Sequence, residues 1–474
     1  MREEESVNDM TALQCDPAAM AAARAALSTL LGDRLSGAAV DREQHSHGEG
    51  VKDVGLPDLV VWPVSTEEVA GIARICSDHG VAMVPFGAGS SLEGQVAAVA
   101  GGVSIDLSRM DRLIEVNPGS LDCRVEAGMR RLRLNEELRA TGLFFPLDPG
   151  ADATLGGMAA TRASGTNAVG YGTMREAVLG LTVVTPDGRI IRTGGRARKS
   201  ATGYDLTRLY IGSEGTLGLI TELQLRLVGR PEGVVTAVCQ FPSLAAATGT
   251  ASLALQMGLR LARIELFDEV QMAACIAYSR LEGMESRASL FVEFHGTPMA
   301  VAEQAEIFRE LAEGEGATGF ARAETQEARD RLWKARHDAY HAVMALRPGC
   351  NNMGTDACVP IENLAPCLLE TQEDVRGSGL VAPIVGHVGD GNFHLGILFD
   401  PDSAEERARA EALADRVSHR ALRFGGSCSG EHGVGLHKSR YLPAEHGEAL
   451  EVMRAIKAAL DPGGLMNPGK IFPA

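Results

Sequence analysis

A strand, a helix and a second strand that lead directly into a glycine-rich loop constrain the fold of this chain more than any other feature. Residues 59–64 form an apolar run, and Ser65 and Glu68 then stand in the spacing of a helix capping box. Apolar residues recur at helical spacing as far as Gly80, a residue typical of helix ends. A second apolar run follows at residues 81–86. We therefore expect a β-α-β unit whose last strand delivers a loop.

The loop at residues 85–94 reads Pro-Phe-Gly-Ala-Gly-Ser-Ser-Leu-Glu-Gly. Glycines let backbone N–H groups approach a pyrophosphate closely, and the two serine hydroxyls add donors. The loop is not the Rossmann fingerprint, because Leu92 stands in place of the third glycine, and it lacks the Gly-Lys pair of a Walker A loop. Taken alone it fits either a phosphate-binding loop or a tight turn between strands.

Length and charge narrow the class of protein. A chain of 474 residues exceeds what one hydrophobic core serves, so several domains are expected. The net charge of −17 argues against a nucleic-acid partner. No apolar stretch reaches the roughly 20 residues that span a bilayer, and the acidic N-terminus resembles no targeting leader. The 9 cysteines are scattered without a C-x-x-C pair, so an iron–sulfur cluster is not expected. We expect a cytoplasmic protein without a transmembrane segment.

Further glycine motifs follow the loop in a fixed order, at residues 148–150, 154–157, 164–167, 171–172 and 212–218. Together they resemble the FAD domain of the vanillyl-alcohol oxidase flavoprotein family. The resemblance implies an α+β fold, with a two-subdomain FAD-binding domain and a C-terminal α+β cap domain built on an antiparallel sheet. The FAD is expected to be non-covalent, because the loop carries no histidine. One departure is Gly170, where related chains carry an arginine. The implied FAD contacts are Pro85, Gly87, Gly89, Ser90, Ser91, Gly94, Pro149, Thr154, Leu155, Gly157, Ser164, Gly165, Asn167, Gly172, Glu214, Gly215, Ile220 and Asn467.

A candidate metal site lies in residues 383–399, where Asp390 and Gly391 separate two β-like runs. Asp-Gly favours a two-residue type I′ turn, which would place His387 opposite His394 with Cβ atoms about 4.5–5.5 Å apart. Glu431, in a glycine-flanked segment, could supply a third ligand. The alternative is an ordinary cross-strand histidine pair and a surface carboxylate.

The C-terminal half, about residues 231–472, resembles FAD-linked D-2-hydroxy acid dehydrogenases in its Gly-His-Val-Gly-Asp-Gly-Asn-Phe-His, Gly-Glu-His-Gly-Val-Gly and Met-Asn-Pro-Gly-Lys segments. The resemblance implies that His387, His394 and Glu431 bind Zn²⁺ or Mn²⁺, with Fe²⁺ as a further candidate. It makes His432 the base that takes the substrate's hydroxyl proton while hydride passes to flavin N5. Electrons would leave to an external quinone, cytochrome or electron-transfer flavoprotein.

The substrate implied by the resemblance is a small anionic 2-hydroxy acid. Arg336 resembles the carboxylate-binding arginine of the family, although it could also be the polar face of a helix. Thr355 and Asn392 are the other expected substrate contacts. Thr355 and Gly396 stand where 2-hydroxyglutarate-specific relatives carry a lysine and an asparagine. The chain therefore favours D-lactate, with a glycolate oxidase subunit or a D-2-hydroxyglutarate dehydrogenase as alternatives.

Four regions are expected: an N-terminal helical segment (1–55), the FAD-binding domain (56–230), the cap domain with the metal-binding hairpin (231–430) and a C-terminal segment that returns to the flavin (431–474). Pro231 marks the main boundary. Helical patterns cover residues 16–31, 245–257, 300–313, 404–424 and 448–460. A homodimer and peripheral attachment to the inner membrane are further expectations.

Overall fold

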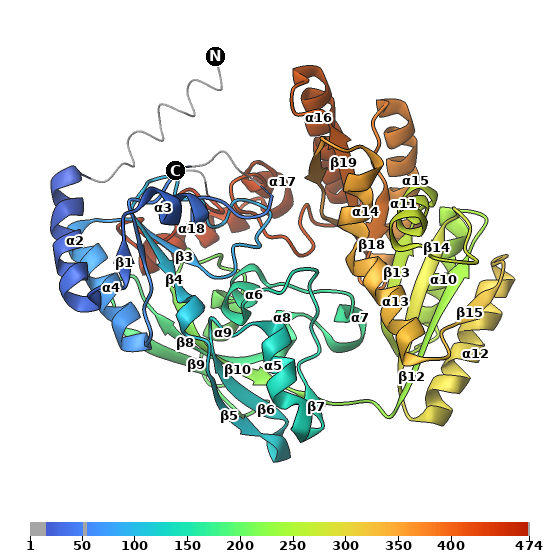
Figure 1. Ribbon diagram of the computed structural model, residues 1–474, viewed down its shortest axis with the longest axis horizontal. Coiled ribbons are helices and arrows are strands. Elements are labelled where there is room, and N and C mark those ends of the chain that lie inside the picture. Colours follow the sequence, from blue (N-terminus) through green and yellow to red (C-terminus); the bar gives the residue numbers. More distant parts are fainter. Residues whose placement is uncertain (1–15, 51–54, 473–474) are drawn as a thin grey trace. The chain divides into compact units, whose positions relative to one another are not determined.

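A computed structural model describes residues 16–50 and 55–472, and Figure 1 shows it as a ribbon. The acidic N-terminus and the last two residues lie outside the described residues. The chain forms two compact units. The first comprises residues up to 164, residues 172–230 and residues from 431 onward; the second comprises residues 165–171 and 231–430. The segment after residue 430 therefore belongs to the unit that contains the glycine-rich loop.

The first unit holds two main sheets. One has four strands in the order β1-β2-β4-β3, and the pairings of β4 with β2 and β3 are parallel. The other has five antiparallel strands in the order β5-β6-β10-β8-β9. The strands are β1 (Leu35–Ser36), β2 (Leu59–Val61), β3 (Met83–Phe86), β4 (Val103–Asp106), β5 (Leu113–Asn117), β6 (Asp122–Glu126), β8 (Val178–Val184), β9 (Ile190–Gly194) and β10 (Leu219–Arg226), with the small pair β7 (Leu143–Phe144) and β11 (Val228–Gly229).

The β-α-β unit predicted from sequence is confirmed. Helix α4 (Thr66–His79) connects β2 to β3, and the Ser65 side chain accepts a hydrogen bond from the backbone N of Glu68 at 3.3 Å. Gly80 ends the helix in the left-handed conformation. The Glu68 carboxylate, however, accepts from the backbone N of Val64 and pairs with Arg34, so only the serine half of the capping box forms as expected.

Further helices of the first unit precede, connect and follow these strands. Helix α2 begins after an Asp16 cap and packs against α4. The helices are α2 (Pro17–Leu31), α3 (Ala39–Gln44), α5 (Arg131–Glu137), α6 (Leu155–Thr161), α8 (Met174–Ala177), α9 (Leu206–Tyr210), α17 (Leu442–His446) and α18 (Ala449–Leu460), with short 3-10 turns η2 (Leu107–Arg109), η3 (Pro118–Ser120), η4 (Leu138–Thr141) and η5 (Ser439–Tyr441). None of the helices within residues 16–50 and 55–472 has the length and apolarity to cross a bilayer.

The second unit is built on the expected antiparallel sheet. Its strands run β15-β12-β14-β13-β18-β19-β16, and β17 also pairs with β19. They are β12 (Gly233–Gln240), β13 (Leu261–Phe267), β14 (Ser289–Gly296), β15 (Phe320–Arg322), β16 (Asn351–Gly354), β17 (Ala357–Cys358), β18 (Ile384–Gly386) and β19 (Asn392–Phe399).

Helices cover both faces of this sheet. One apolar core joins it to α10 (Leu244–Gln256), α12 (Pro298–Gly314), α15 (Ile361–Ser378) and α16 (Ala404–Arg423). A second core joins the other face, through Phe267 and Phe291, to α11 (Glu269–Ser279), α13 (Gln326–His337) and α14 (Ala339–Leu346). Since side chains alternate between the faces of a strand, Arg263 and Glu265 share the α13 face with Phe267.

The register predicted for the histidine hairpin is wrong. Val385, not His387, lies opposite His394, and His387 begins the connection between β18 and β19. A type I′ turn needs positive φ at both central residues, and of Asp390 and Gly391 only Gly391 has it (φ 76°). The backbone N of Asp390 donates instead to the carbonyl oxygen of His387 at 2.9 Å, and Asn392 N donates to the same oxygen at 3.3 Å. The connection is thus a longer, helix-like turn.

Candidate functional site

The glycine-rich loop after β3 packs against the start of α6. A Cβ atom on Gly87 would lie 2.3 Å from Oγ1 of Thr154, the residue that caps α6. A Cβ on Gly215 would lie 2.2 Å from Cγ of Pro85. Only glycine fits at these two positions, and the close packing brings together four residues that the sequence predicted to contact FAD.

Two buried hydroxyls of the first unit suit a polar cofactor. Ser91 Oγ and Ser213 Oγ have no hydrogen-bond partner among the residues that the structure describes. Buried hydroxyls are normally satisfied, so unpaired ones beside a glycine-rich loop fit a ligand that carries phosphate and hydroxyl groups. The FAD expected from the sequence is such a ligand.

The other predicted FAD contacts divide between the units. Leu155 and Ile220 are buried in the apolar core of the first unit. Pro149, Gly157 and Ser164 belong to the same unit. Gly165 and Asn167 belong to the second unit, where Asn167 Oδ1 accepts from Arg263 Nε at 2.7 Å. Gly89, Gly94 and Gly172 have positive φ, which fits tight turns at these positions.

The C-terminal segment contacts the stretch that follows the glycine-rich loop. Asn467 Nδ2 donates to the carbonyl oxygens of Gln95 and Glu214 at 2.9 and 2.7 Å. Lys470 is buried, donates to the carbonyl oxygens of Ala97 and Pro468, and burial lowers its pKa to about 7. The segment is therefore fixed to the stretch that directly follows the glycine-rich loop.

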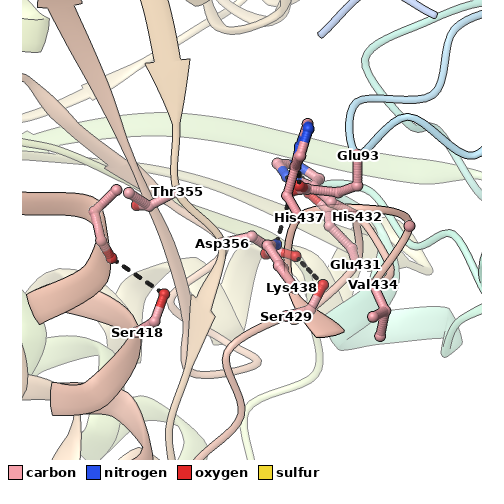
Figure 2. Close-up of polar contacts among 12 residues, drawn as sticks. Glu93, Thr355, Asp356, Ser418, Ser429, Glu431, His432, Val434, His437 and Lys438 are labelled. Atoms are coloured by element: carbon pink, nitrogen blue, oxygen red, sulfur yellow. Dashed lines mark hydrogen bonds and ion pairs between the residues drawn. The ribbon is translucent and has the colours of Figure 1, made fainter. Parts of the chain in front are cut away.

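Glu93, the acidic residue of the loop, was missed by the sequence analysis. Lys438 Nζ lies 2.9 Å from its carboxylate, and ring nitrogens of His437 and His432 lie at 3.4 and 3.9 Å (Figure 2). Burial raises the pKa of Glu93, but the charges of Lys438 and His432 and a hydrogen bond from His437 outweigh burial and lower it. The sequence signal for Glu93 was the one charged residue in an otherwise uncharged glycine-rich loop. Glu93 thus joins the predicted phosphate loop to the segment that carries the predicted base.

In the second unit, the two predicted metal-binding histidines lie together despite the shifted register. Their ring centroids are 5.5 Å apart. His387 Nδ1 contacts Glu265 Oε1 at 2.7 Å, and His394 Nδ1 contacts the carbonyl oxygen of Thr355 at 3.0 Å. An acceptor at Nδ1 orients an imidazole to offer Nε2 to a metal, which is the usual arrangement around protein metal ions. The histidine pair therefore fits a divalent cation.

Glu265 also holds the predicted substrate arginine. Arg336 Nε donates to Glu265 Oε2 at 2.6 Å, and the Glu265 side chain is fully buried. Burial raises the pKa of Glu265, but His387 and Arg336 outweigh burial and lower it. One carboxylate on β13 thus orients both a histidine and a guanidinium, and the bond through Nε leaves the outer edge of the guanidinium for an anionic partner.

Asp356, also missed, anchors the chain that leads to Glu431. Asn392 Nδ2 donates to Asp356 Oδ1 at 2.9 Å. Ser429 Oγ donates to Asp356 Oδ2 at 2.8 Å (Figure 2). The backbone N of Gly430 donates to the Asp356 carbonyl oxygen at 3.2 Å. The Thr355 hydroxyl accepts from the backbone N of Leu395 at 3.0 Å. Thr355 and Asn392, predicted as substrate contacts, thus hold the hairpin and its surroundings in place, while Asn392 Oδ1 has no partner within the described part of the chain.

Close packing explains why position 170 holds a glycine. It lies in α7 (Ala168–Tyr171), which packs on β13, and a Cβ there would lie 2.8 Å from the Leu261 carbonyl oxygen and 3.0 Å from Ala262 Cα. We expect Gly170→Arg to push α7 off the sheet and to destabilise the protein by about 1–3 kcal/mol, measured as a lower unfolding temperature.

Gly377→Ala is the matched control for that substitution. Gly377 lies in α15, and a Cβ there would meet nothing within 4 Å. Alanine is the better helix former, so the control should unfold at the same or a slightly higher temperature. An arginine at position 170 that left the unfolding temperature unchanged would contradict the close packing of α7 on β13.

Comparison with known proteins agrees with this organisation. Residues 57–194 match the family described as FAD binding domain, and residues 230–471 match FAD linked oxidases, C-terminal domain. The chain therefore belongs to the FAD-linked oxidases, which are FAD-dependent oxidoreductases, as the sequence predicted. A solved 4-ethylphenol oxidase from Gulosibacter chungangensis has the same fold, with a TM-score of 0.80 at 18% identity over 97% of this chain and 98% of that one. The predicted vanillyl-alcohol oxidase type of fold is confirmed.

Curated relatives are more similar in sequence. The chain is 49% identical to a protein named probable D-lactate dehydrogenase, mitochondrial, from Danio rerio, over 91% of this chain and 87% of the relative. It is 45% identical to D-lactate dehydrogenase [cytochrome], mitochondrial, from Arabidopsis thaliana, over 94% of this chain and 79% of the relative. Both names place the relatives in mitochondria, whereas the sequence predicted a cytoplasmic location for this chain.

Proposed function

We propose that the protein oxidises D-lactate to pyruvate and passes the electrons to an external cytochrome-type acceptor. The observation that carries the proposal is the shared carboxylate of Glu265, which couples a predicted metal-binding histidine to a predicted carboxylate-binding arginine. A 2-hydroxy acid presents a hydroxyl and a carboxylate on adjacent carbons, so its recognition calls for such a pair of neighbouring groups. The names of the two relatives support the choice of D-lactate and of a cytochrome.

His387 and His394 would hold a divalent ion, Zn²⁺ or Mn²⁺, with Glu431 as a third ligand. Glu431 directly follows Gly430, whose backbone is bonded to Asp356, so the chain is anchored one residue before the carboxylate. When bound, the ion supplies Lewis acidity that lowers the pKa of a coordinated hydroxyl. Two imidazoles and one carboxylate suit these metals.

His432 would take the hydroxyl proton, and the guanidinium of Arg336 would orient the substrate carboxylate. A positioned base contributes about 10²–10⁴ in rate. The residues that would hold FAD are those of the glycine-rich loop and the start of α6, and bound FAD supplies the two-electron acceptor. Position 355 holds an uncharged threonine, which offers no cation to a second substrate carboxylate.

The test is an anaerobic mixture of the yellow holoprotein with D-lactate, L-lactate, glycolate or D-2-hydroxyglutarate, followed by flavin absorbance. We expect D-lactate to bleach the flavin fastest, L-lactate to leave it oxidised, and a chelator to abolish the bleaching. Faster bleaching by D-2-hydroxyglutarate or glycolate than by D-lactate would overturn the substrate assignment.

A further inference from the structure

The turn that carries His432 is held by side chains from two distant motifs of the first unit. Gln95 Nε2 donates to the His432 carbonyl oxygen at 2.8 Å. The Glu214 carboxylate accepts from the backbone N of Val434 at 2.7 Å through Oε1 and from the backbone N of Gly435 at 2.8 Å through Oε2. The backbone is therefore fixed at the base itself and again two and three residues after it.

The glycines of this turn fit the same carboxylate. Gly433 has φ 81°, and a Cβ atom there would lie 2.7 Å from Glu214 Oε1. A Cβ on Gly435 would lie 2.0 Å from the Glu93 carbonyl oxygen. The chain can pass this close to Glu214 and Glu93 only because both positions lack side chains.

Glu214 occupies a costly conformation. It is one of the few non-glycine residues with positive φ, at 52°, and it is 4% exposed. Burial raises the pKa of Glu214 to about 7, while hydrogen bonds from Val434 and Gly435 lower it. A buried side chain on a left-handed backbone is strained and persists only where its surroundings require it. Here its backbone N is bonded to the Ala160 carbonyl oxygen and its own carbonyl oxygen accepts from Asn467 Nδ2.

We infer that Glu214, rather than contacting the cofactor through its carboxylate, is a positioning residue that fixes the turn bearing the base His432. The inference rests on the proposed function, because it assigns Glu214 a part in the same proton transfer. Both carboxylate oxygens are used by consecutive backbone N–H groups, so the side chain acts on the turn directly. The charged and polar groups that face it are Glu93 in the loop, Gln95 directly after the loop, and Lys470.

The test compares holoenzymes of wild type, Glu214→Gln and Glu126→Gln. A glutamine amide offers one acceptor oxygen, and its NH₂ group would face the second backbone N–H, so one bond to the turn is lost. We expect Glu214→Gln to keep its FAD, to exchange the amide hydrogen of Val434 or Gly435 faster, and to reduce flavin with D-lactate about 10–100-fold more slowly. The loss should fall on kcat with KM little changed, because Arg336 is untouched.

Glu126→Gln is the matched control. Glu126 is 2% exposed and accepts from the backbone N of Arg112 at 2.9 Å. Glu126→Gln therefore also replaces a buried carboxylate that is bonded to a backbone donor. It should keep the wild-type rate. A second variant, Gly433→Ala, should disturb the turn from the other side and lower kcat in the same way.

The outcomes separate the two claims. If the wild-type flavin is not reduced by D-lactate, the proposed function fails and the positioning role falls with it. Suppose instead that D-lactate reduces the wild-type flavin. If Glu214→Gln then reduces its flavin at the wild-type rate, or exchanges the amide hydrogens of Val434 and Gly435 no faster than wild type, only the positioning role is overturned. Loss of FAD from Glu214→Gln alone would overturn it as well, since the carboxylate would then serve the cofactor.

Discussion

Replacing His432 by alanine should slow flavin reduction by D-lactate about 10²–10⁴-fold, because the variant lacks the group that accepts the hydroxyl proton. The backbone of this residue is held by Gln95, whose Nε2 donates to the His432 carbonyl oxygen. The turn should therefore survive the loss of the imidazole, and the FAD content should stay at the wild-type level. Anaerobic stopped-flow absorbance measures the rate of the reductive half-reaction directly.

His419→Ala serves as the control for that experiment. His419 lies on α16, is 58% exposed and pairs with Asp415, so its loss should leave the rate of flavin reduction unchanged. If His432→Ala reduced its flavin within a few-fold of the wild-type rate, His432 would not be the base. Retained FAD absorbance in both variants excludes loss of the cofactor as the cause of a slow rate.

Signals that lie close together in the sequence predicted structure well. Helix α4 follows from a serine cap, an apolar stripe and a terminal Gly80, all within one element, and it forms as expected. The turn of the histidine hairpin does not form as expected, although its Asp-Gly signal also lies within two adjacent residues. Val388 is fully buried, and a Cβ on Gly389 would lie 2.6 Å from Val169 Cγ2, so packing against α7 shapes this turn. Tertiary contacts outweighed the preference of two residues.

The carboxylates that organise the candidate site were the main gap. Glu265 meets His387 across 122 residues of sequence and Arg336 across 71, so no local spacing relates them. A signal did exist, because Glu265 interrupts the apolar run of β13, and a charged residue in a buried strand needs a partner. A buried charge in the sequence indicates that Glu265 has a partner, but it does not identify which residue that partner is. The histidines were paired correctly in space although the register was wrong, because both flank one short connection.

Glu265→Gln should weaken metal binding about 10–100-fold, because it disturbs the group that orients a metal-binding histidine. Arg336 Nε can only donate, so the amide oxygen must turn toward it, and the NH₂ group then faces His387 Nδ1. His387 Nδ1 would have to become an acceptor, which moves the proton to Nε2 and removes the lone pair that would bind a metal. If the glutamine amide takes the opposite orientation, its oxygen still accepts from His387 Nδ1, but Arg336 Nε loses its acceptor. Either arrangement damages the site, and removing one partner of a buried ion pair also costs about 3–5 kcal/mol of stability.

Titration of the metal-free protein with Zn²⁺ against a competing chelator measures the first effect, and thermal unfolding measures the second. Asp268→Asn is the control, because Asp268 is a buried carboxylate of the same unit that accepts from backbone groups, namely Gln271 N at 2.7 Å, Val270 and Ile384. It should lower stability without changing the affinity for Zn²⁺. Equal Zn²⁺ affinity in wild type and Glu265→Gln would mean that the orientation of His387 does not depend on Glu265, and the shared carboxylate would then have no part in binding a metal.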